Sequence, residues 1–324
     1  MNWFGIMLAG FLAAPSLAQE QPNTHLAQPN PAGPVRPDQP AGGIRTAADL
    51  LDQLESADED LKSLDADILY ERVFGLEGDV QERRGKLYYV DTKARTPDGK
   101  PGAGSRKFAI HVQWLKLGRQ EPMRQDHLMI FDGEWLVEKQ AGEKQIVKRQ
   151  ITRAGQGFDP LKVGEGPFPL PIGQKRQDIL SRFDAVLLKP TEGLVANTPA
   201  MQKQLDKFVE GTHQIKLTPR QHDPNAELSE IRLWYREDPK LKRLLPRLAR
   251  TVTPQGDVSL VQLVNVKVNQ PVASDVLDTR TPQGWKEDVQ PLPIQAPAPA
   301  QPTAPATNSP RPTTPEQAVP ENRR

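Results

Sequence analysis

The chain has 324 residues, of which 42 are Lys or Arg and 41 are Asp or Glu, so its formal net charge is +1. This balance argues against a nucleic-acid-binding protein, which usually carries a clear basic excess. The sequence contains no cysteine, which excludes disulfides, thiolate nucleophiles, cysteine-ligated metals and a lipidated N-terminal cysteine.

The N-terminus has the pattern of an export signal. Residues 3–14 form an apolar run, followed by Pro15 and then Ser16-Leu17-Ala18. Small residues at 16 and 18 suit the −3 and −1 positions of a signal-peptidase site, which predicts cleavage after Ala18. The run is shorter than the roughly 20 residues that a spanning helix needs. No Lys or Arg precedes it, so an uncleaved anchor is the alternative to a signal peptide at 1–18.

Proline is concentrated in two segments without aromatic residues, 19–43 and 291–324. Such compositions cannot bury enough apolar surface to fold, so we expect a disordered spacer and a disordered Pro/Ala-rich tail. The tail favours an extended tether over a specific PxxP ligand. The folded part is then a single region, 44–290.

The folded part opens with a helical pattern. Apolar residues recur at helical spacing between Leu50 and Leu61. Thr46 can cap this helix, and Asp49 follows three residues later as in a capping box. We therefore expect a helix with one apolar face at the start of the domain.

After residue 64 the apolar period changes to two, which predicts strands. The expected strands of this part lie at 68–74, 80–91, 107–114, 128–131, 134–138 and 145–152. The cleanest alternation is that of Phe108, Ile110, Val112 and Trp114. Asp132-Gly133 is a strong hairpin signal because Gly supplies the positive φ of such turns. Short connections between the strands predict an antiparallel meander.

Gly and Pro residues interrupt this strand pattern over 154–210. The apolar spacing within this interval predicts helices around Gln174–Phe183 and Pro199–Val209, and Thr198 can cap the second helix. Strands resume at 213–218, 228–235, 248–253 and 257–268, and a short last strand is expected at Val276–Thr279. The run 257–268 is apolar on both sides near its centre, as in a strand covered on both faces. The total is about nine to eleven strands.

A search for catalytic motifs finds little. Gly99–Ser105 resembles a phosphate loop, but a strand follows it where a helix is required, so a hairpin loop is favoured. The five histidines include no HExxH pair, and no G-x-S-x-G motif occurs. We expect no catalytic residue, metal site or cofactor, and therefore not an enzyme, with a hydrolase as the remaining alternative.

The order of features resembles the LolA/LolB family of periplasmic lipoprotein carriers over about residues 46–290. The matching features, in order, are the amphipathic helix, Gly85-Lys86-Leu87-Tyr88, the strand with Phe108 and Trp114, the hairpin from Leu128 to Leu136, the helical insertion, His213–Pro219, Leu263–Asn269, and Pro282-Gln283-Gly284. Each motif is weak alone, and their order carries the resemblance.

The resemblance implies an α+β, mainly β fold: an incomplete antiparallel β-barrel with helices covering the concave face around an apolar cavity. It also implies a soluble, periplasmic, LolA-like carrier of acylated lipoproteins or other lipids. Such a carrier would receive cargo from an inner-membrane ABC transporter and deliver it to an outer-membrane acceptor. The alternative is a lipid- or peptide-binding envelope-stress sensor. We expect a monomer.

Within this resemblance, the candidate acyl-cavity residues are Leu87, Tyr89, Phe108, Ile110, Val112, Trp114, Leu128, Ile130, Phe168 and Phe183. The same side chains could equally be ordinary core packed against the first helix. The family's Arg-Pro pair, whose arginine ties the helical lid to the barrel, is replaced here by the longer loop Thr92–Ser105. Arg106 is the nearest arginine and hence the candidate lid latch.

Overall fold

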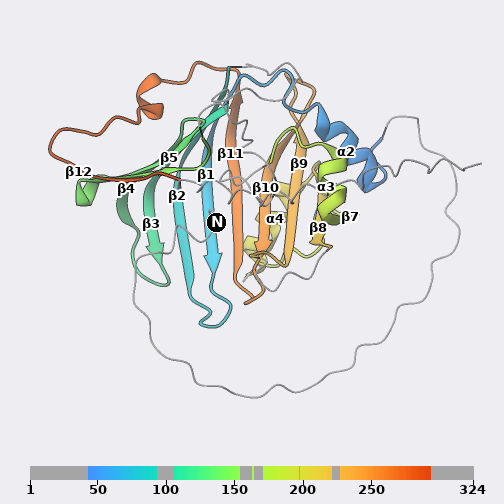
Figure 1. Cartoon of the computed structure of the whole chain (residues 1–324). Helices are drawn as coiled ribbons and strands as arrows, with labels where there is room; N and C mark the ends of the chain where they lie inside the picture. Colours follow the sequence, from blue (N-terminus) through green and yellow to red (C-terminus); the bar gives the residue numbers. More distant parts are fainter. Residues whose placement is uncertain are drawn as a thin grey trace, which may run out of the picture. The chain divides into compact units, whose positions relative to one another are not determined.

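A computed structural model of the protein describes residues 43–92, 106–153, 163, 171–196, 198–220 and 227–292. The helices are α2 (Ala47–Glu55), α3 (Arg176–Arg182) and α4 (Pro199–Val209), with short 3-10 helices η1 (Ala141–Glu143) and η2 (Ser274–Leu277). The strands are β1 (Ser63–Val73), β2 (Val80–Asp91), β3 (Arg106–Leu117), β4 (Met123–Phe131), β5 (Trp135–Gln140), β6 (Gln145–Gln150), β7 (Phe183–Leu188), β8 (His213–Pro219), β9 (Glu230–Glu237), β10 (Leu244–Val252), β11 (Val258–Val268) and β12 (Lys286–Gln290) (Figure 1).

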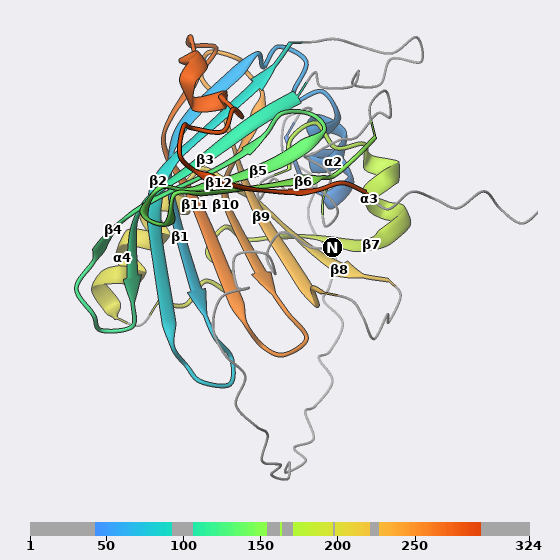
Figure 2. The ribbon, with the colours of Figure 1, turned by 60° about the vertical axis from the view of Figure 1, so that its left-hand side comes forward.

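All of these strands belong to one twelve-stranded sheet in the order β12-β6-β5-β4-β3-β2-β1-β11-β10-β9-β8-β7. Every pairing is antiparallel except that of β12 with β6. The sheet is twisted and curved, as Figure 2 shows, and its two end strands do not pair with each other. The fold is therefore mainly β, an open antiparallel half-barrel with helices, which confirms the predicted fold class.

Two differences from the predicted elements lie at the edges of the sheet. The expected strand at Val276–Thr279 does not form: its first two residues belong to the 3-10 helix η2, and the last strand is β12 further along the chain. The sequence of β12 gives no alternation signal because all five of its residues are exposed. Strand β7, at the opposite edge, was not predicted and begins at Phe183, immediately after α3.

Local signals in the sequence set the starts of α2 and α4 as predicted, whereas α2 ends at Glu55, before the helical pattern of the sequence ends at Leu61. The backbone N–H of Asp49 donates to Thr46 Oγ1 at 3.1 Å, and the N–H of Thr46 donates to Asp49 Oδ2 at 2.9 Å. This is the expected capping box, which satisfies N–H groups that have no partner within the helix. Thr198 likewise accepts from the N–H of Met201 at 3.2 Å and begins α4.

The sheet buries apolar side chains on both faces. The inner face packs on α2 and α3 in one large cluster. On the outer face, Leu205, Phe208 and Val209 from α4 pack against Trp234 and Leu248. A second outer cluster lies on β3–β6 under Leu277 and Trp285 of the C-terminal segment. Strand β11 contributes to the inner cluster and, through Leu260, to the α4 cluster, as expected for a strand covered on both sides.

None of the helices in these described stretches is long and apolar enough to cross a membrane. The predicted signal peptide 1–18 and most of the spacer 19–43 and of the tail 291–324 lie outside the described residues.

Candidate functional site

The inner face of β1–β5 is built from rows of residues that pair directly across neighbouring strands. The row nearest α2 consists of Leu64, Tyr89, Phe108, Phe131 and Leu136. The next row consists of Ala66, Leu87, Ile110, Met129 and Glu138. The rings of Phe108 and Phe131 stack with their centroids 5.6 Å apart. The apolar members of both rows are at most 1% exposed.

Five of the predicted cavity residues lie together on this face: Leu87, Tyr89, Phe108, Ile110 and Val112. Phe183 joins the same cluster from the far edge of the sheet, where it begins β7. Phe168 lies outside the described residues.

The register places Leu128 and Ile130 on the opposite face from Phe108. Ile130 pairs with Ala109 and belongs to the outer cluster, against which Leu128 also packs. Met129 and Phe131 take the inner positions instead. The run Leu128-Met129-Ile130-Phe131 is apolar throughout, so alternation could not indicate which half faces inward.

Trp114 also differs from the strict alternation of the predicted strand. Val112 pairs with Gly85 and Trp114 pairs with Arg84, so Gln113 is an extra residue opposite a continuous β2. Such a bulge reverses the face of every following residue. Trp114 is therefore turned to the outer face, where its side chain is 41% exposed and lies 5.5 Å from Arg124 Cζ.

Gly85 supports this bulge because no side chain fits at its position. A Cβ there would lie 1.9 Å from the carbonyl oxygen of His111. The close approach of β2 and β3 at the bulge thus requires glycine.

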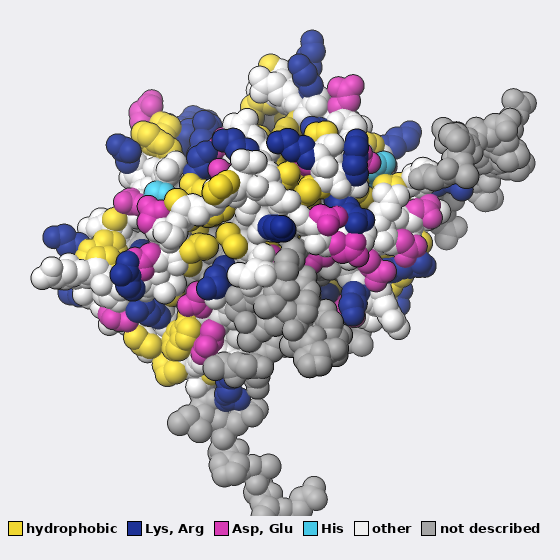
Figure 3. All heavy atoms as spheres, turned by 90° about the horizontal axis from the view of Figure 1, so that it is seen from above, with side chains coloured by type: hydrophobic (Ala, Val, Ile, Leu, Met, Phe, Trp, Pro, Cys, Tyr) yellow, Lys and Arg dark blue, Asp and Glu magenta, His cyan; other side chains and the backbone are white. Residues whose placement is uncertain are grey.

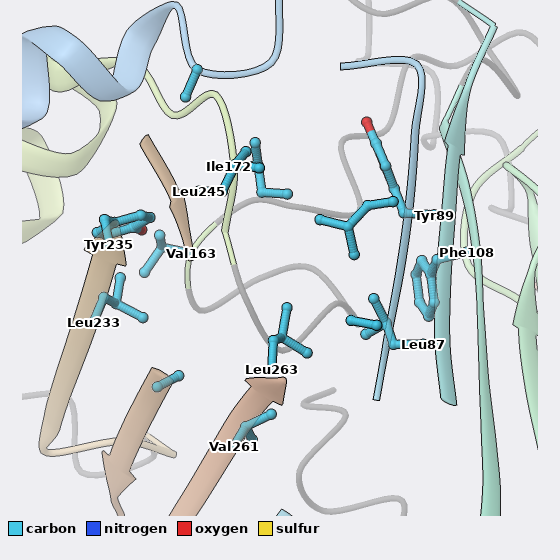
Figure 4. Packing of buried hydrophobic residues seen from close by; sticks show 14 of the residues in the cluster. Leu87, Tyr89, Phe108, Val163, Ile172, Leu233, Tyr235, Leu245, Val261 and Leu263 are labelled. Atoms are coloured by element: carbon cyan, nitrogen blue, oxygen red, sulfur yellow. The ribbon is translucent and has the colours of Figure 1, made fainter. Parts of the chain in front are cut away.

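Two short helices and one irregular segment cover the inner face. Helix α2 contributes Leu50, Leu51 and Leu54, and α3 contributes Ile179. Ile172 lies in the segment that precedes α3. In Figure 4, Leu87, Tyr89 and Phe108 lie opposite Leu233 and Tyr235 from the other half of the sheet, and Val163, which belongs to no strand, lies beside Tyr235. Ile172 and Leu245 lie at one end of this group, and Leu263 lies between the two halves. The apolar interior is thus enclosed between the curved sheet and this cover.

The cover is fixed to the sheet by a buried ion pair. A guanidinium nitrogen of Arg106, at the start of β3, contacts Asp58 Oδ2 just after α2. Arg106 Nε also lies 3.5 Å from Asp91 Oδ2 at the end of β2. These side chains are at most 9% exposed. Arg106, the predicted lid-latch candidate, therefore connects the sheet to the segment after α2.

Asp58 also packs closely on the segment before α3. Gly173 has φ +66°, and a Cβ on it would lie 2.4 Å from the Asp58 carboxyl group. The Tyr235 hydroxyl donates to the carbonyl oxygen of Pro171 at 3.3 Å. Both parts of the cover therefore meet at Asp58.

The inner face carries a buried charged group at its β4–β6 end. Glu138 contacts Arg149, and its Oε2 lies 3.7 Å from His127 Nε2. Burial acts to raise the pKa of Glu138, but the neighbouring His127 and Arg149 outweigh burial and hold that pKa below its usual value. Glu138 is therefore an ionised, paired carboxylate beside the apolar rows.

The described residues hold no group of three or more His, Cys, Asp or Glu side chains that could bind a metal ion. An open pocket of about 440 Å³ lies on the outer side of the β2–β3 end, where Glu82, Arg84, Trp114 and Lys116 are among its lining residues. Seen from above, hydrophobic side chains lie in small patches among acidic and basic groups, as Figure 3 shows. The large apolar surface of this protein is the enclosed inner face.

Sequence reasoning missed several members of the inner cluster, including Met129, Phe131, Leu136, Ile172 and Tyr235. Tyr235 ends a strand that was predicted, and its position two residues after Leu233 could have indicated the inner face. Ile172 lies in a Gly/Pro-rich stretch that has no periodicity, so no local signal could place it.

In comparisons of the sequence, no family and no curated protein matches this chain. Solved structures, including the following three, are similar to it at low sequence identity. A domain described as an outer membrane lipoprotein-sorting protein domain from Vibrio parahaemolyticus has 10% identity and a TM-score of 0.37, covering 71% of this chain and 95% of its own. The LolA superfamily protein NE2245 from Nitrosomonas europaea has 10% identity and a TM-score of 0.29, covering 72% and 98%. LprF from Mycobacterium bovis has 12% identity and a TM-score of 0.32, covering 70% and 94%.

Proposed function

We propose that the protein binds the acyl chains of lipoproteins or other lipids on its inner face and carries them through the periplasm. The observation that supports this proposal is the continuous apolar interior of an open sheet, which spans β1–β4 and β7–β11 under a separate cover. Such a site needs shape and apolar surface, because each buried CH₂ contributes about 0.8 kcal/mol. A 16-carbon chain could gain on the order of 10 kcal/mol before ordering costs.

The cover is suited to moving away from the sheet. Helix α2 has 9 residues and α3 has 7, and helices this short depend on tertiary packing for their stability. If α2 and α3 separate from the sheet, an acyl chain can replace them against Tyr89, Phe108 and Ile110. The Arg106–Asp58 pair must then break, which makes Arg106 a latch between a closed and an open state.

The proposal is tested with a fluorescent fatty-acyl probe and the full chain. We expect the wild-type protein to bind the probe and palmitate to displace it. The variant Ile110→Glu should lose binding, because a carboxylate among acyl chains must be desolvated at a cost of several kcal/mol. Lys107→Glu, on the outer side of the same strand by its pairing with Val90, is the matched control and should bind normally.

Far-UV circular dichroism establishes whether each variant keeps its sheet. A wild-type protein that fails to bind the probe would contradict the proposal. So would a folded Ile110→Glu variant with unchanged affinity. If Ile110→Glu does not fold, Ile110→Phe, which fills space without adding charge, should weaken binding and replaces it in the comparison.

Export is part of this proposal, since a periplasmic carrier must leave the cytoplasm. We infer that cleavage after Ala18 releases a protein that begins at Gln19. N-terminal sequencing of the exported form checks this start. Retention of residues 1–18 in a membrane fraction would identify them as an anchor instead.

A further inference from the structure

The inner face is not uniform along the strands. The rows are counted from the one nearest α2. The third row contains Ile68, Gly85, Val112 and His127, and the fourth row contains Tyr70, Arg83 and Leu115. The fifth row is polar across four neighbouring strands: Thr251, Ser259, Arg72 and Gln81. Gln125 lies on the same face of β4, two residues before His127. We call Tyr70, Arg72, Gln81, Arg83, Gln125, His127, Thr251 and Ser259 the polar belt.

Much of the polar belt is buried although its side chains are polar, and Gln81, Gln125 and His127 are half-buried. Thr251, Ser259, Arg72 and Arg83 are at most 9% exposed. Some of its groups have partners within the protein. Arg72 Nη2 lies 2.6 Å from Asp257 Oδ2, and the Tyr70 hydroxyl lies 3.2 Å from Ser259 Oγ. The Arg83 guanidinium lies 5.8 Å from the centre of the Tyr70 ring.

Two side-chain atoms of the belt are buried and have no hydrogen-bond partner among the described contacts: Gln81 Oε1 and Gln125 Oε1. A buried polar atom without a partner costs about 1–3 kcal/mol, so proteins rarely retain such groups without a use. Both come from the same end of the inner face, on β2 and β4. Each is an amide oxygen and therefore accepts hydrogen bonds. The neighbouring His127 Nε2 instead faces the Glu138 carboxylate, 3.7 Å away.

We propose that the polar belt binds the hydroxylated head group of an amphipathic ligand whose chain lies on the apolar rows. This inference rests on the proposed acyl-binding function and names the ligand class as acyl chains esterified to a glycerol- or sugar-like polyol. Hydroxyl groups supply the hydrogen-bond donors that the amide oxygens of Gln81 and Gln125 accept. The guanidinium groups of the belt supply donors to the oxygens of the same head group.

The direction of the ligand follows from the rows. The first row, which is wholly apolar, lies next to α2, and the fifth row, which is polar, lies four rows of paired residues away. The ligand's chain therefore extends towards the cover, and the head group stays at the end of the sheet remote from Arg106. A ligand that has an acyl chain but no hydroxyl groups would cover the apolar rows and would give the belt no hydrogen-bond donors.

The test compares two ligands that share one acyl chain: a 1-monoacylglycerol and the corresponding fatty-acid methyl ester. Both are measured by displacement of the fluorescent acyl probe from the full chain. We expect the monoacylglycerol to bind about tenfold more tightly, as two modest hydrogen bonds allow. The double variant Gln81→Leu with Gln125→Leu should remove this preference and leave the affinity for the methyl ester unchanged.

Gln262→Leu is the matched control, because Gln262 pairs with Leu248 on the outer face. It should keep the wild-type preference. If circular dichroism shows that the double leucine variant folds poorly, Gln81→Met with Gln125→Met replaces it. Equal wild-type affinity for the two ligands would overturn the head-group site while leaving acyl binding intact. A double variant that keeps the preference would also overturn it. Failure of both ligands to bind would overturn the acyl-binding function itself.

Discussion

The inner and outer faces of β1–β4 come from the same strands, yet they hold their charges differently. On the inner side, Arg106 contacts Asp58 with both side chains almost fully buried. On the outer side, Lys86 contacts Asp67, and Lys116 lies 2.8 Å from Glu82, all with substantial solvent exposure. Exposed pairs of this kind contribute about 0–1 kcal/mol, whereas breaking a buried pair costs several.

The apolar surfaces of the two faces differ in the same way. The inner cluster is continuous across most of the sheet. The outer clusters are two separate patches, one under α4 and one under the C-terminal segment. This difference predicts that equivalent substitutions will have large effects on the inner face and small effects on the outer face.

The largest effect is expected for Phe108→Ala. Phe108 is fully buried and stacks on Phe131, and truncation of a buried Phe to Ala typically lowers the free energy of unfolding by about 3–5 kcal/mol. Urea denaturation measures this change. Val289→Ala, at an exposed position of β12, is the control and should change stability by less than about 0.5 kcal/mol. A loss below about 1 kcal/mol for Phe108→Ala would mean that the inner face is not closely packed.

A slightly smaller loss is expected for Arg106→Ala. The change leaves Asp58 and Asp91 buried without this guanidinium, at a cost of about 3 kcal/mol. The matched outer change, Lys86→Ala, removes the partially exposed pair with Asp67 and should cost less than about 1 kcal/mol. If Arg106 is also the latch, the variant should bind the acyl probe faster, which stopped-flow fluorescence measures. Equal losses of unfolding free energy in Arg106→Ala and Lys86→Ala would contradict the difference between buried inner and exposed outer ion pairs.

A smaller effect is expected for Trp114→Ala, which tests the bulge. Trp114 is partly exposed on the outer face, so truncation should lower the unfolding free energy by about 1 kcal/mol or less. Its acyl-probe affinity should equal that of the wild-type protein. A loss as large as that of Phe108→Ala, or weakened probe binding, would place Trp114 on the inner face after all.

The smallest effect is expected for deletion of residues 291–324. This tail has no aromatic residue and little apolar area to bury, so the thermal midpoint should stay nearly unchanged. The N–H of Leu292 donates to Gln150 Oε1 at 3.1 Å, a bond worth about 0.5–1.5 kcal/mol at most. Differential scanning calorimetry compares the two chains. A large drop in the midpoint would show that the tail packs on the domain.

The sequence by itself determined the features that depend on neighbouring residues. The capping box at Thr46 and Asp49, the start of α4 at Thr198 and the turn at Asp132-Gly133 all follow from short-range hydrogen bonding. In that turn, Gly133 has φ +109°, which glycine adopts without strain. The alternation of Phe108, Ile110 and Val112 correctly predicted that they share one face of the sheet, because one side of that strand segment is more apolar than the other.

Only the tertiary structure decided which residues share the inner face as a whole. The bulge at Gln113 turned Trp114 outward, and the register of β3 on β4 chose Met129 and Phe131 over their apolar neighbours. The contact of Arg106 with Asp58 joins residues 48 positions apart, and the fifth inner row joins Arg72 to Ser259. No local pattern encodes these pairings, because each is set by the packing of strands and cover that are distant in the chain.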